Sequence, residues 1–191
     1  MRIKKTLKEW AIIDIGVGYR DDLGEEFING QLIKKYAAGT KHNRIAGKIF
    51  HIFETYLTGK AAAALGSRYD LYLTDRDRFI PDGMIVCDQR KIKEDGIHGA
   101  PDLVVEILYP TTAFRDRGYK KDVYETCGVP EYWIVDPENR AIEVYLIQNG
   151  KYTLDNLYIL YPDYMLEKMT DKEKSVLETK FKCHLYDDLF I

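Results

Sequence analysis

A glutamate in the middle of an apolar run places the strongest constraint on how this chain folds. The run extends from Leu103 to Leu108, and every residue in it except Glu106 is apolar. A continuous apolar run of this length is typical of a strand that is buried on both faces. An ionised carboxylate in such a strand is costly unless a partner compensates its charge. The sequence therefore predicts that a metal ion, a lysine or both lie against Glu106.

Residues that could complete such a site lie in the stretch from Phe79 to Asp136. Asp82 follows a proline in the apolar run that precedes the glutamate strand, and Lys120 lies in the helical segment that follows it. Carboxylates on neighbouring strands are oxygen ligands of the kind that Mg²⁺ prefers. A nearby cation would help to offset charge on a phosphate. The stretch is thus a candidate site for phosphodiester chemistry.

This pattern resembles the PD-(D/E)XK nuclease superfamily, which has the restriction-endonuclease-like fold. The finer pattern is similar to one branch, the Uma-type family of endonucleases. A weaker likeness reaches back to the segment from Phe27 to Leu32 and to His42. The strong likeness is found in Pro101 to Glu106, Asp116, Lys120, Tyr124 and Gly128 to Asp136.

The resemblance implies a metal-dependent endonuclease that hydrolyses the phosphodiester bonds of DNA. Asp82 and Glu106 would be catalytic carboxylates that hold Mg²⁺ or Mn²⁺, with the main-chain carbonyl of Ile107 as a further ligand. In the common superfamily pattern a lysine lies two residues after the acidic residue, where this chain has Leu108. Lys120 matches the Uma-type position on the following helix, from which it would orient the attacking water.

The same residues also allow simpler structural roles. Asp82 could cap a strand or turn, and Lys120 could pair with Asp116 four residues earlier on the helix surface. Tyr124, on the same helix face as Lys120, is interpreted as a core or interface aromatic, and Asp102 as a hydrogen-bonding residue at the entry of its strand. His42, in the first turn of a long helix, fits a hydrogen bond to a nearby loop better than a catalytic role, with a contact to a substrate phosphate as the alternative. Glu26 is a distant acidic residue that could join the metal shell, as such a residue sometimes does in related folds.

The expected fold is α/β, as a single domain over residues 1–191. It has a restriction-endonuclease-like core, in which a central mixed β-sheet is flanked by helices, together with an N-terminal β-hairpin and C-terminal β-strands. Apolar periodicity and turn residues place these elements. Central strands are expected at 79–86, 102–108 and 131–136, with the last two parallel. Further expectations are helices at 6–12, 40–58 and 112–127, and hairpin turns at Asn29-Gly30 and Asn149-Gly150. We also expect a helical or loop piece at 61–65, a polar loop at 88–99, and strands at 69–74, 141–147, 151–160 and 181–185.

Charge and composition limit the partners. The net charge is −3, so binding to DNA would need a local basic patch rather than overall attraction. Cys87, Cys127 and Cys183 are far apart in sequence, which argues against a disulfide framework or a zinc site and fits a reducing compartment. No apolar run reaches the length of a membrane span, and no signal-peptide pattern is present. A cytoplasmic protein is therefore expected.

Three functions remain open at this point. The carboxylate inside an apolar strand favours a DNA endonuclease. The negative net charge and the displaced lysine favour a catalytically inactive nuclease-fold protein that binds nucleic acid or a protein partner. A metal-dependent hydrolase of another phosphoester is a third reading. Nucleases of this type often act as homodimers to cut two strands, but the sequence fixes no interface.

Overall fold

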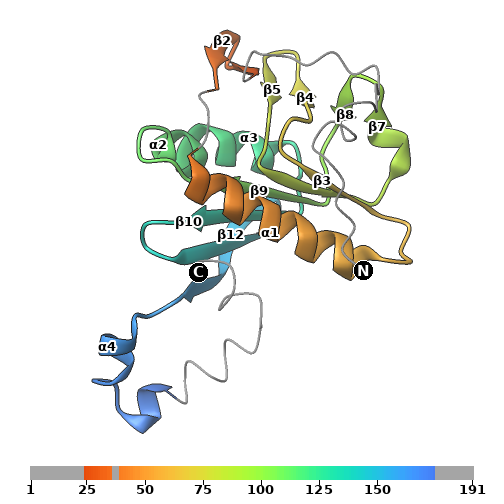
Figure 1. The fold of residues 1–191 in the computed structure, drawn as a ribbon. Coiled ribbons are helices and arrows are strands. Elements are labelled where there is room, and N and C mark those ends of the chain that lie inside the picture. The colour runs from red at the N-terminus through yellow and green to blue at the C-terminus, as the bar shows by residue number, and fades with distance from the viewer. Residues whose placement is uncertain (1–23, 36–38, 175–191) are drawn as a thin grey trace, which may run out of the picture.

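Two β-sheets form the frame of the molecule (Figure 1). The computed structural model describes residues 24–35 and 39–174. The central sheet contains β3 (Ala63–Gly66), β6 (Gly83–Val86), β9 (Leu103–Ile107), β10 (Glu131–Asp136), β11 (Ala141–Gln148) and β12 (Lys151–Ile159). Their order across the sheet is β12-β11-β10-β9-β6-β3. The second sheet contains β1 (Glu25–Ile28), β2 (Gln31–Lys34), β4 (Leu71–Thr74), β5 (Asp77–Phe79), β7 (Ile92–Lys93) and β8 (Gly96–His98).

The central sheet is mixed, as expected. β9 and β10 run parallel with Glu106 opposite Ile134, whereas β6 pairs with β9 in the antiparallel direction. β10, β11 and β12 continue as an antiparallel series. The predicted turns at Asn29-Gly30 and Asn149-Gly150 are confirmed, since all four residues have the positive φ that a tight hairpin turn requires.

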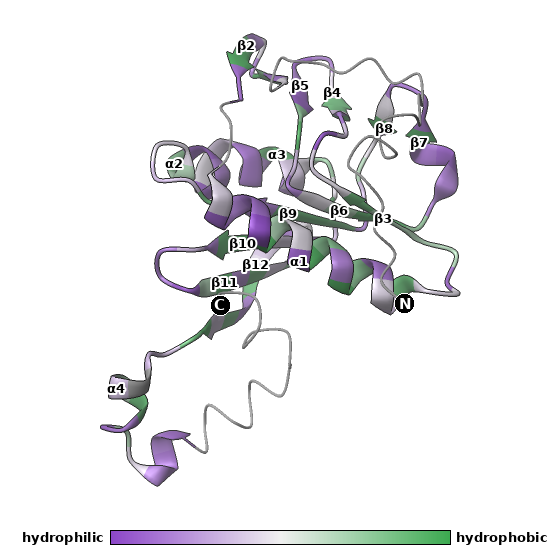
Figure 2. Cartoon of the chain, in the orientation of Figure 1, coloured by the Kyte–Doolittle hydropathy of each residue, from purple (hydrophilic) through white to green (hydrophobic). Residues whose placement is uncertain are grey.

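Each face of β9 packs against a different partner. Leu103, Val105 and Ile107 belong to one apolar cluster with the buried side of α1 (Thr40–Leu57). Val104 and Leu108 belong to the other cluster, with side chains of the second sheet and Tyr124. Figure 2 shows hydrophobic residues along β9, β6 and β3, and a hydrophobic side on α1. Because side chains alternate along a strand, Glu106 shares the face of Val104 and points away from α1.

The helix expected at 112–127 is present in three consecutive pieces. These are α2 (Ala113–Arg115), the π-helical η3 (Asp116–Lys120) and α3 (Lys121–Thr126). The end at Gly128 is confirmed, because Gly128 has φ +80° and Val129 N–H donates to the carbonyl of Tyr124. Such a glycine cap satisfies carbonyls that the last helical turn leaves free.

The expected strand at 79–86 is wrong in one respect, because the chain changes sheets within it. Phe79 ends β5 in the second sheet, and Gly83 begins β6 in the central sheet. Pro81 between them has no N–H to donate to a ladder. Asp82 N–H already donates to the carbonyl of Val105 at 3.1 Å. Asp82 therefore lies where the two sheets meet.

Two smaller expectations are also wrong. The segment at 61–65 is largely strand, since β3 pairs with β6 and buries Ala64 and Leu65. The polar loop at 88–99 contains the 3-10 helix η2 (Gln89–Lys91) and the short strands β7 and β8. The segments expected at 6–12 and 181–185 lie outside the described residues. The described chain ends after α4 (Asp163–Leu166), and none of its helices has both the length and the apolar character of a membrane span.

Candidate active site

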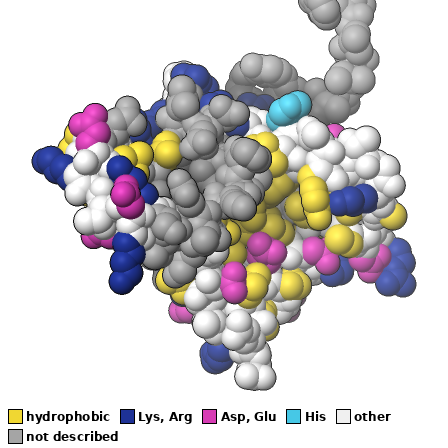
Figure 3. Space-filling view, turned by 90° about the horizontal axis from the view of Figure 1, so that it is seen from below, with side chains coloured by type: hydrophobic (Ala, Val, Ile, Leu, Met, Phe, Trp, Pro, Cys, Tyr) yellow, Lys and Arg dark blue, Asp and Glu magenta, His cyan; other side chains and the backbone are white. Residues whose placement is uncertain are grey.

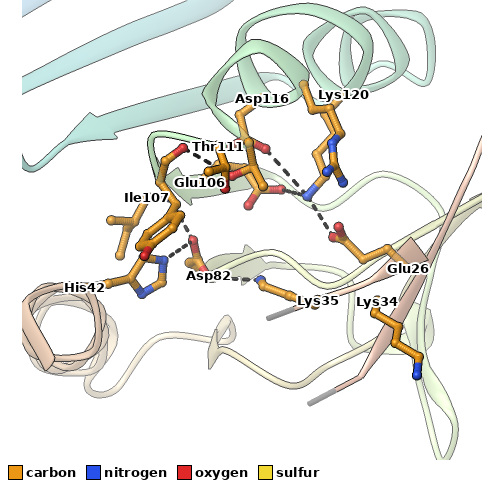
Figure 4. Close-up of a pocket in the computed structure, with 13 residues that line it drawn as sticks. Glu26, Lys34, Lys35, His42, Asp82, Glu106, Ile107, Thr111, Asp116 and Lys120 are labelled. Carbon is orange, nitrogen blue, oxygen red and sulfur yellow. Dashed lines mark hydrogen bonds and ion pairs between the residues drawn. The ribbon is translucent and has the colours of Figure 1, made fainter. Parts of the chain in front are cut away.

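A cavity of about 380 Å³ lies between the two sheets and the helical segment 113–126 (Figure 4). Most of the residues that line it have charged or polar side chains, and the four acidic residues among them are buried. The lining residues are Glu26, Lys34, Lys35, His42, Asp82, Glu106, Ile107, Tyr109, Thr111, Thr112, Arg115, Asp116 and Lys120.

Glu106 has the compensating partner that its place in an apolar strand requires. Its Oε1 accepts a hydrogen bond from Lys120 Nζ at 2.9 Å and another from the hydroxyl of Tyr124 at 2.7 Å. Both donors come from the helical segment that follows β9. The ammonium group of Lys120 thus points to Glu106, as the position of Lys120 on the helix led us to expect.

Lys120 also links Glu106 to two more carboxylates. Its Nζ donates to Glu26 Oε1 at 2.7 Å and lies 3.7 Å from Asp116 Oδ1. Glu26 is fixed in turn by the N–H of Ile80, which donates to the same Oε1 at 2.9 Å. The side chain of Lys120 is only 4% exposed, so the cluster is buried. β1, β9 and η3 each contribute a carboxylate to it.

Asp82 is the centre of a second set of contacts. Its Oδ2 accepts from the main-chain N–H of Ile107 at 2.8 Å and lies 3.1 Å from His42 Nε2. Its Oδ1 accepts from Lys35 Nζ at 3.1 Å. Lys35 also donates to the carbonyl of Ile80. Asp82 is therefore held by the strand next to its own, by α1 and by the residue after β2.

The two strand carboxylates differ in pKa. Burial alone would raise the pKa of Asp82, but the charge of Lys35 and the hydrogen bond from His42 hold it well below its ordinary value. Burial raises the pKa of Glu106 to about 8; the charge of Lys120 opposes this rise, and the charges of Asp116 and Asp82 add to it. Burial likewise raises the pKa of Asp116. Of these two residues, Glu106 therefore holds a proton more readily than Asp82 does.

The charges in the cavity suit a bound cation. At the buried end of the cavity, the carboxyl groups of Glu26, Asp82, Glu106 and Asp116 outnumber the ammonium groups of Lys35 and Lys120 by two, whereas the cations Lys34 and Arg115 lie at the mouth. Carboxylate and carbonyl oxygens are the ligands that Mg²⁺ takes, often one or two carboxylates with several waters. The described residues contain no group of three or more His, Cys, Asp or Glu arranged as a ready-made metal cluster. The donor set therefore fits a magnesium-type ion that keeps part of its water shell.

All the residues singled out in the sequence line this one cavity. Asp82, Glu106, Ile107 and Lys120 come together, and the two additional candidates, Glu26 and His42, join them; the complete set is given by the lining residues above. The pair of Lys120 with Asp116 is buried rather than on the surface. Asp102 takes no part, because its carboxylate accepts from the N–H of Cys87 at 2.7 Å.

Two contributors to the site were not found from the sequence. Lys35 follows β2, and no local pattern links it to Asp82, 47 residues later. Tyr124 was expected to be a core or interface aromatic, and it is fully buried, but its hydroxyl also bonds to Glu106. Its place four residues after Lys120 indicated that it shares the helix face turned to the site, but not that its hydroxyl would bond to Glu106.

Comparison with known proteins places these residues in a family. Residues 20–165 match the model of the Uma2 family, described as "Putative restriction endonuclease". Two Synechocystis sp. (strain ATCC 27184 / PCC 6803 / Kazusa) proteins, slr1290 and sll1609, both described as uncharacterized, are 26% and 24% identical over 63% of this chain. The chain spans 64% of the length of slr1290 and 70% of that of sll1609.

A solved structure shares the fold. It is a crystal structure from Anabaena variabilis ATCC 29413, described as a "putative nuclease belonging to DUF820". The match covers 87% of this chain and 89% of that chain, with a TM-score of 0.62 and 18% sequence identity. The expected fold class is thereby confirmed. Because the family model matches most of the chain, this protein belongs to the Uma2 family and has a restriction-endonuclease-like fold.

Proposed function

We propose that this protein is a metal-dependent DNA endonuclease that hydrolyses phosphodiester bonds. The observation that carries the proposal is the contact of Lys120 with Glu106 at 2.9 Å, inside a cavity that Asp82 also lines. The lysine of the superfamily pattern is missing from the strand, where Leu108 takes its place, but its charge is supplied from the next helix. The family description supports the nuclease reading.

Asp82, Glu106 and the carbonyl of Ile107 are the groups that would hold Mg²⁺ or Mn²⁺. Such an ion polarises a phosphoryl oxygen and lowers the pKa of a bound water. Lys120 has three N–H groups, of which Glu26 and Glu106 take two. Asp116, at 3.7 Å, is beyond hydrogen-bond distance, so the third N–H remains for a water or a phosphate oxygen. Lys120 would thus position the nucleophile and stabilise charge on the phosphate.

His42 and Lys35 would act through Asp82. Both contact its carboxylate, so they fix the direction in which its oxygens point and keep it ionised. Tyr124 fixes the direction of the Glu106 carboxyl group through the hydrogen bond to Oε1. We infer that these three are positioning residues rather than catalytic ones. Burial of the whole network limits the access of bulk water to the carboxylates.

The test is a nicking assay on negatively supercoiled plasmid DNA with Mg²⁺ or Mn²⁺, with and without chelator. Lys120→Ala should lower cleavage by roughly a hundredfold or more, the scale for losing one positioned charge in a transition state. Lys121→Ala is the matched control, because the neighbouring lysine lies 3.8 Å from the ring of Tyr145 and outside the cavity. It should cleave like the unmodified protein.

A second variant separates an effect on cleavage from a loss of the fold. Lys120→Arg keeps the positive charge among the buried carboxylates, but a planar guanidinium does not reproduce a compact ammonium group. It should fold, as judged by circular dichroism, and still cleave slowly. Cleavage at the unmodified rate by either Lys120 variant, or cleavage that survives chelator, would contradict the proposal. A pure protein that never cleaves with either metal would favour the inactive, binding-only alternative.

A further inference from the structure

The mouth of the cavity differs in character from its interior. Inside, carboxylates hold both lysines. At the mouth, Lys34 is exposed and Arg115 is half-buried, and neither forms an ion pair with a carboxylate of the described residues. Figure 4 shows Lys34 pointing away from the carboxylate cluster. Several other surface cations are paired, for example Lys41 with Glu138 at 2.9 Å. The mouth therefore offers positive charge to an incoming anion.

Two aromatic rings stand beside these cations. Tyr109 lines the cavity and is 50% exposed, and Phe114, next to Arg115 on α2, is 72% exposed. The guanidinium of Arg115 lies 5.8 Å from the centroid of the Phe114 ring. Thr111, which is also exposed, lies between Tyr109 and Phe114 in the sequence and adds a hydroxyl group. Exposed rings interleaved with cations form the type of surface on which bases stack while phosphates are neutralised.

We propose that this mouth binds an unpaired DNA strand, with its phosphates against Lys34 and Arg115 and a base stacked on Tyr109 or Phe114. The inference rests on the proposed nuclease function and names the substrate form that the site takes. A base can use a stacking platform only when it is free of its own helix. The favoured substrate is thus single-stranded or locally opened DNA rather than an intact duplex.

Size and charge agree with this choice. A cavity of about 380 Å³ is comparable to a small-molecule pocket, so it can admit one nucleotide unit but not a duplex. Proteins that bind duplex DNA through its backbone often make many phosphate contacts. Here the mouth has two cations, Lys34 and Arg115, that form no ion pair within residues 24–35 and 39–174, and the net charge of the chain is −3. On the face shown in Figure 3, Lys and Arg side chains are scattered and do not gather into one area.

The test measures binding without cleavage. Fluorescence anisotropy with a labelled oligonucleotide, single-stranded or annealed to its complement, is recorded in chelator. The single strand should bind at least about fivefold more tightly than the duplex, the lower end of the effect of stacking one base. The double variant Tyr109→Ala/Phe114→Ala should lose that preference. Tyr56→Ala is the matched control, because Tyr56 is 68% exposed near the far end of α1.

Salt dependence tests the cations separately. For single strands, log Kd changes with log salt by about 0.7 for each phosphate that is neutralised. Lys34→Ala and Arg115→Ala should each reduce that slope by about this amount, whereas Lys60→Ala, beside Tyr56, should not. Equal affinity for duplex and single strand would overturn the inference. So would a Tyr109→Ala/Phe114→Ala variant that keeps the single-strand preference of the Tyr56→Ala control. Because no metal is present, that result is distinct from a failure to nick plasmid.

Discussion

At the scale of single residues, Glu106 has the pKa that most affects how stability depends on pH. Its pKa in the folded chain is about 8, against an ordinary 4.5, because burial disfavours its charge. Between these values the folded chain keeps a proton that the unfolded chain has lost, so the free energy of unfolding falls as pH rises. Asp116 acts in the same direction. Asp82 and Glu26, with lowered pKa values, lose their stabilising effect only below about pH 4.

Urea denaturation in chelator at about pH 5 and pH 8 measures this effect. The unmodified protein should be less stable at the higher pH. Glu106→Gln, which keeps the shape of the side chain without an acidic proton, should show a clearly smaller fall. Glu54→Gln, on the exposed side of α1, is the control and should behave like the unmodified protein. An equal fall in the Glu106 variant would show that its carboxyl group does not titrate in this range.

Asp82 should matter to stability in a different way. Its carboxylate, 3% exposed, accepts from Ile107 N–H and Lys35 and contacts His42. Asp82→Ala leaves the charge of Lys35 without its carboxylate partner, and breaking a buried pair in this way costs about 3–5 kcal/mol. Chemical denaturation should show that loss, and a smaller one for Asp82→Asn. Glu138→Ala, which removes only the exposed ion pair with Lys41, should leave the unfolding transition nearly unchanged.

At the scale of elements, the three-piece helix after β9 contains a glycine whose replacement should stabilise the protein. Gly118 lies inside η3, its φ is not positive, and a Cβ added there would meet nothing within 4 Å. Gly118→Ala should therefore raise the free energy of unfolding by about 0.5–1 kcal/mol. Thermal denaturation checks the result. Gly128→Ala is the opposite control, because φ +80° is costly for a residue with a side chain, and it should destabilise the protein.

Helices and strands with a strong apolar periodicity could be predicted from the sequence. The point at which the chain passes from the second sheet to the central sheet could not. The apolar spacing of α1 and the alternation in β11 and β12 identified these elements to within a few residues. The break between Phe79 and Gly83 was missed because Phe79 to Val86 reads as one largely apolar run, whereas Phe79 belongs to β5 and Gly83 begins β6. Pairing with strands that are distant in sequence, of β5 with β1 and of β6 with β9, decides where the run divides.

At the scale of the whole molecule, the candidate site is where distant parts of the chain meet. Glu106 was identifiable because charge in an apolar strand is a local anomaly. Lys35 was not, because its ion pair with Asp82 spans 47 residues and depends on how the second sheet packs on the central one. The type of site could thus be predicted from the sequence. The complete set of charged residues around Asp82 and Glu106 could be identified only from the tertiary structure.

That meeting of distant parts gives the last prediction. The carboxylates come from both sheets and from η3, and when all four are ionised their formal excess of −2 over Lys35 and Lys120 opposes the packing that brings them together. A divalent cation that binds only the folded chain should relieve this repulsion and stabilise the whole molecule. At a hundred times its Kd the gain is about 2.7 kcal/mol, which corresponds to roughly 5–10 °C in Tm for a chain of this size.

Calorimetric melting with and without Mg²⁺ measures that shift, and it does so without reference to activity. NaCl at equal ionic strength is the control, because screening alone would act on surface charges as well. Glu54→Gln should keep the shift, since it lies outside the cavity. Asp82→Asn and Glu106→Gln should lose most of it, since each removes one of the carboxylates assigned to the ion. A shift that NaCl reproduces, or one that both variants retain in full, would mean that the cation acts elsewhere and that the metal assignment to Asp82 and Glu106 is wrong.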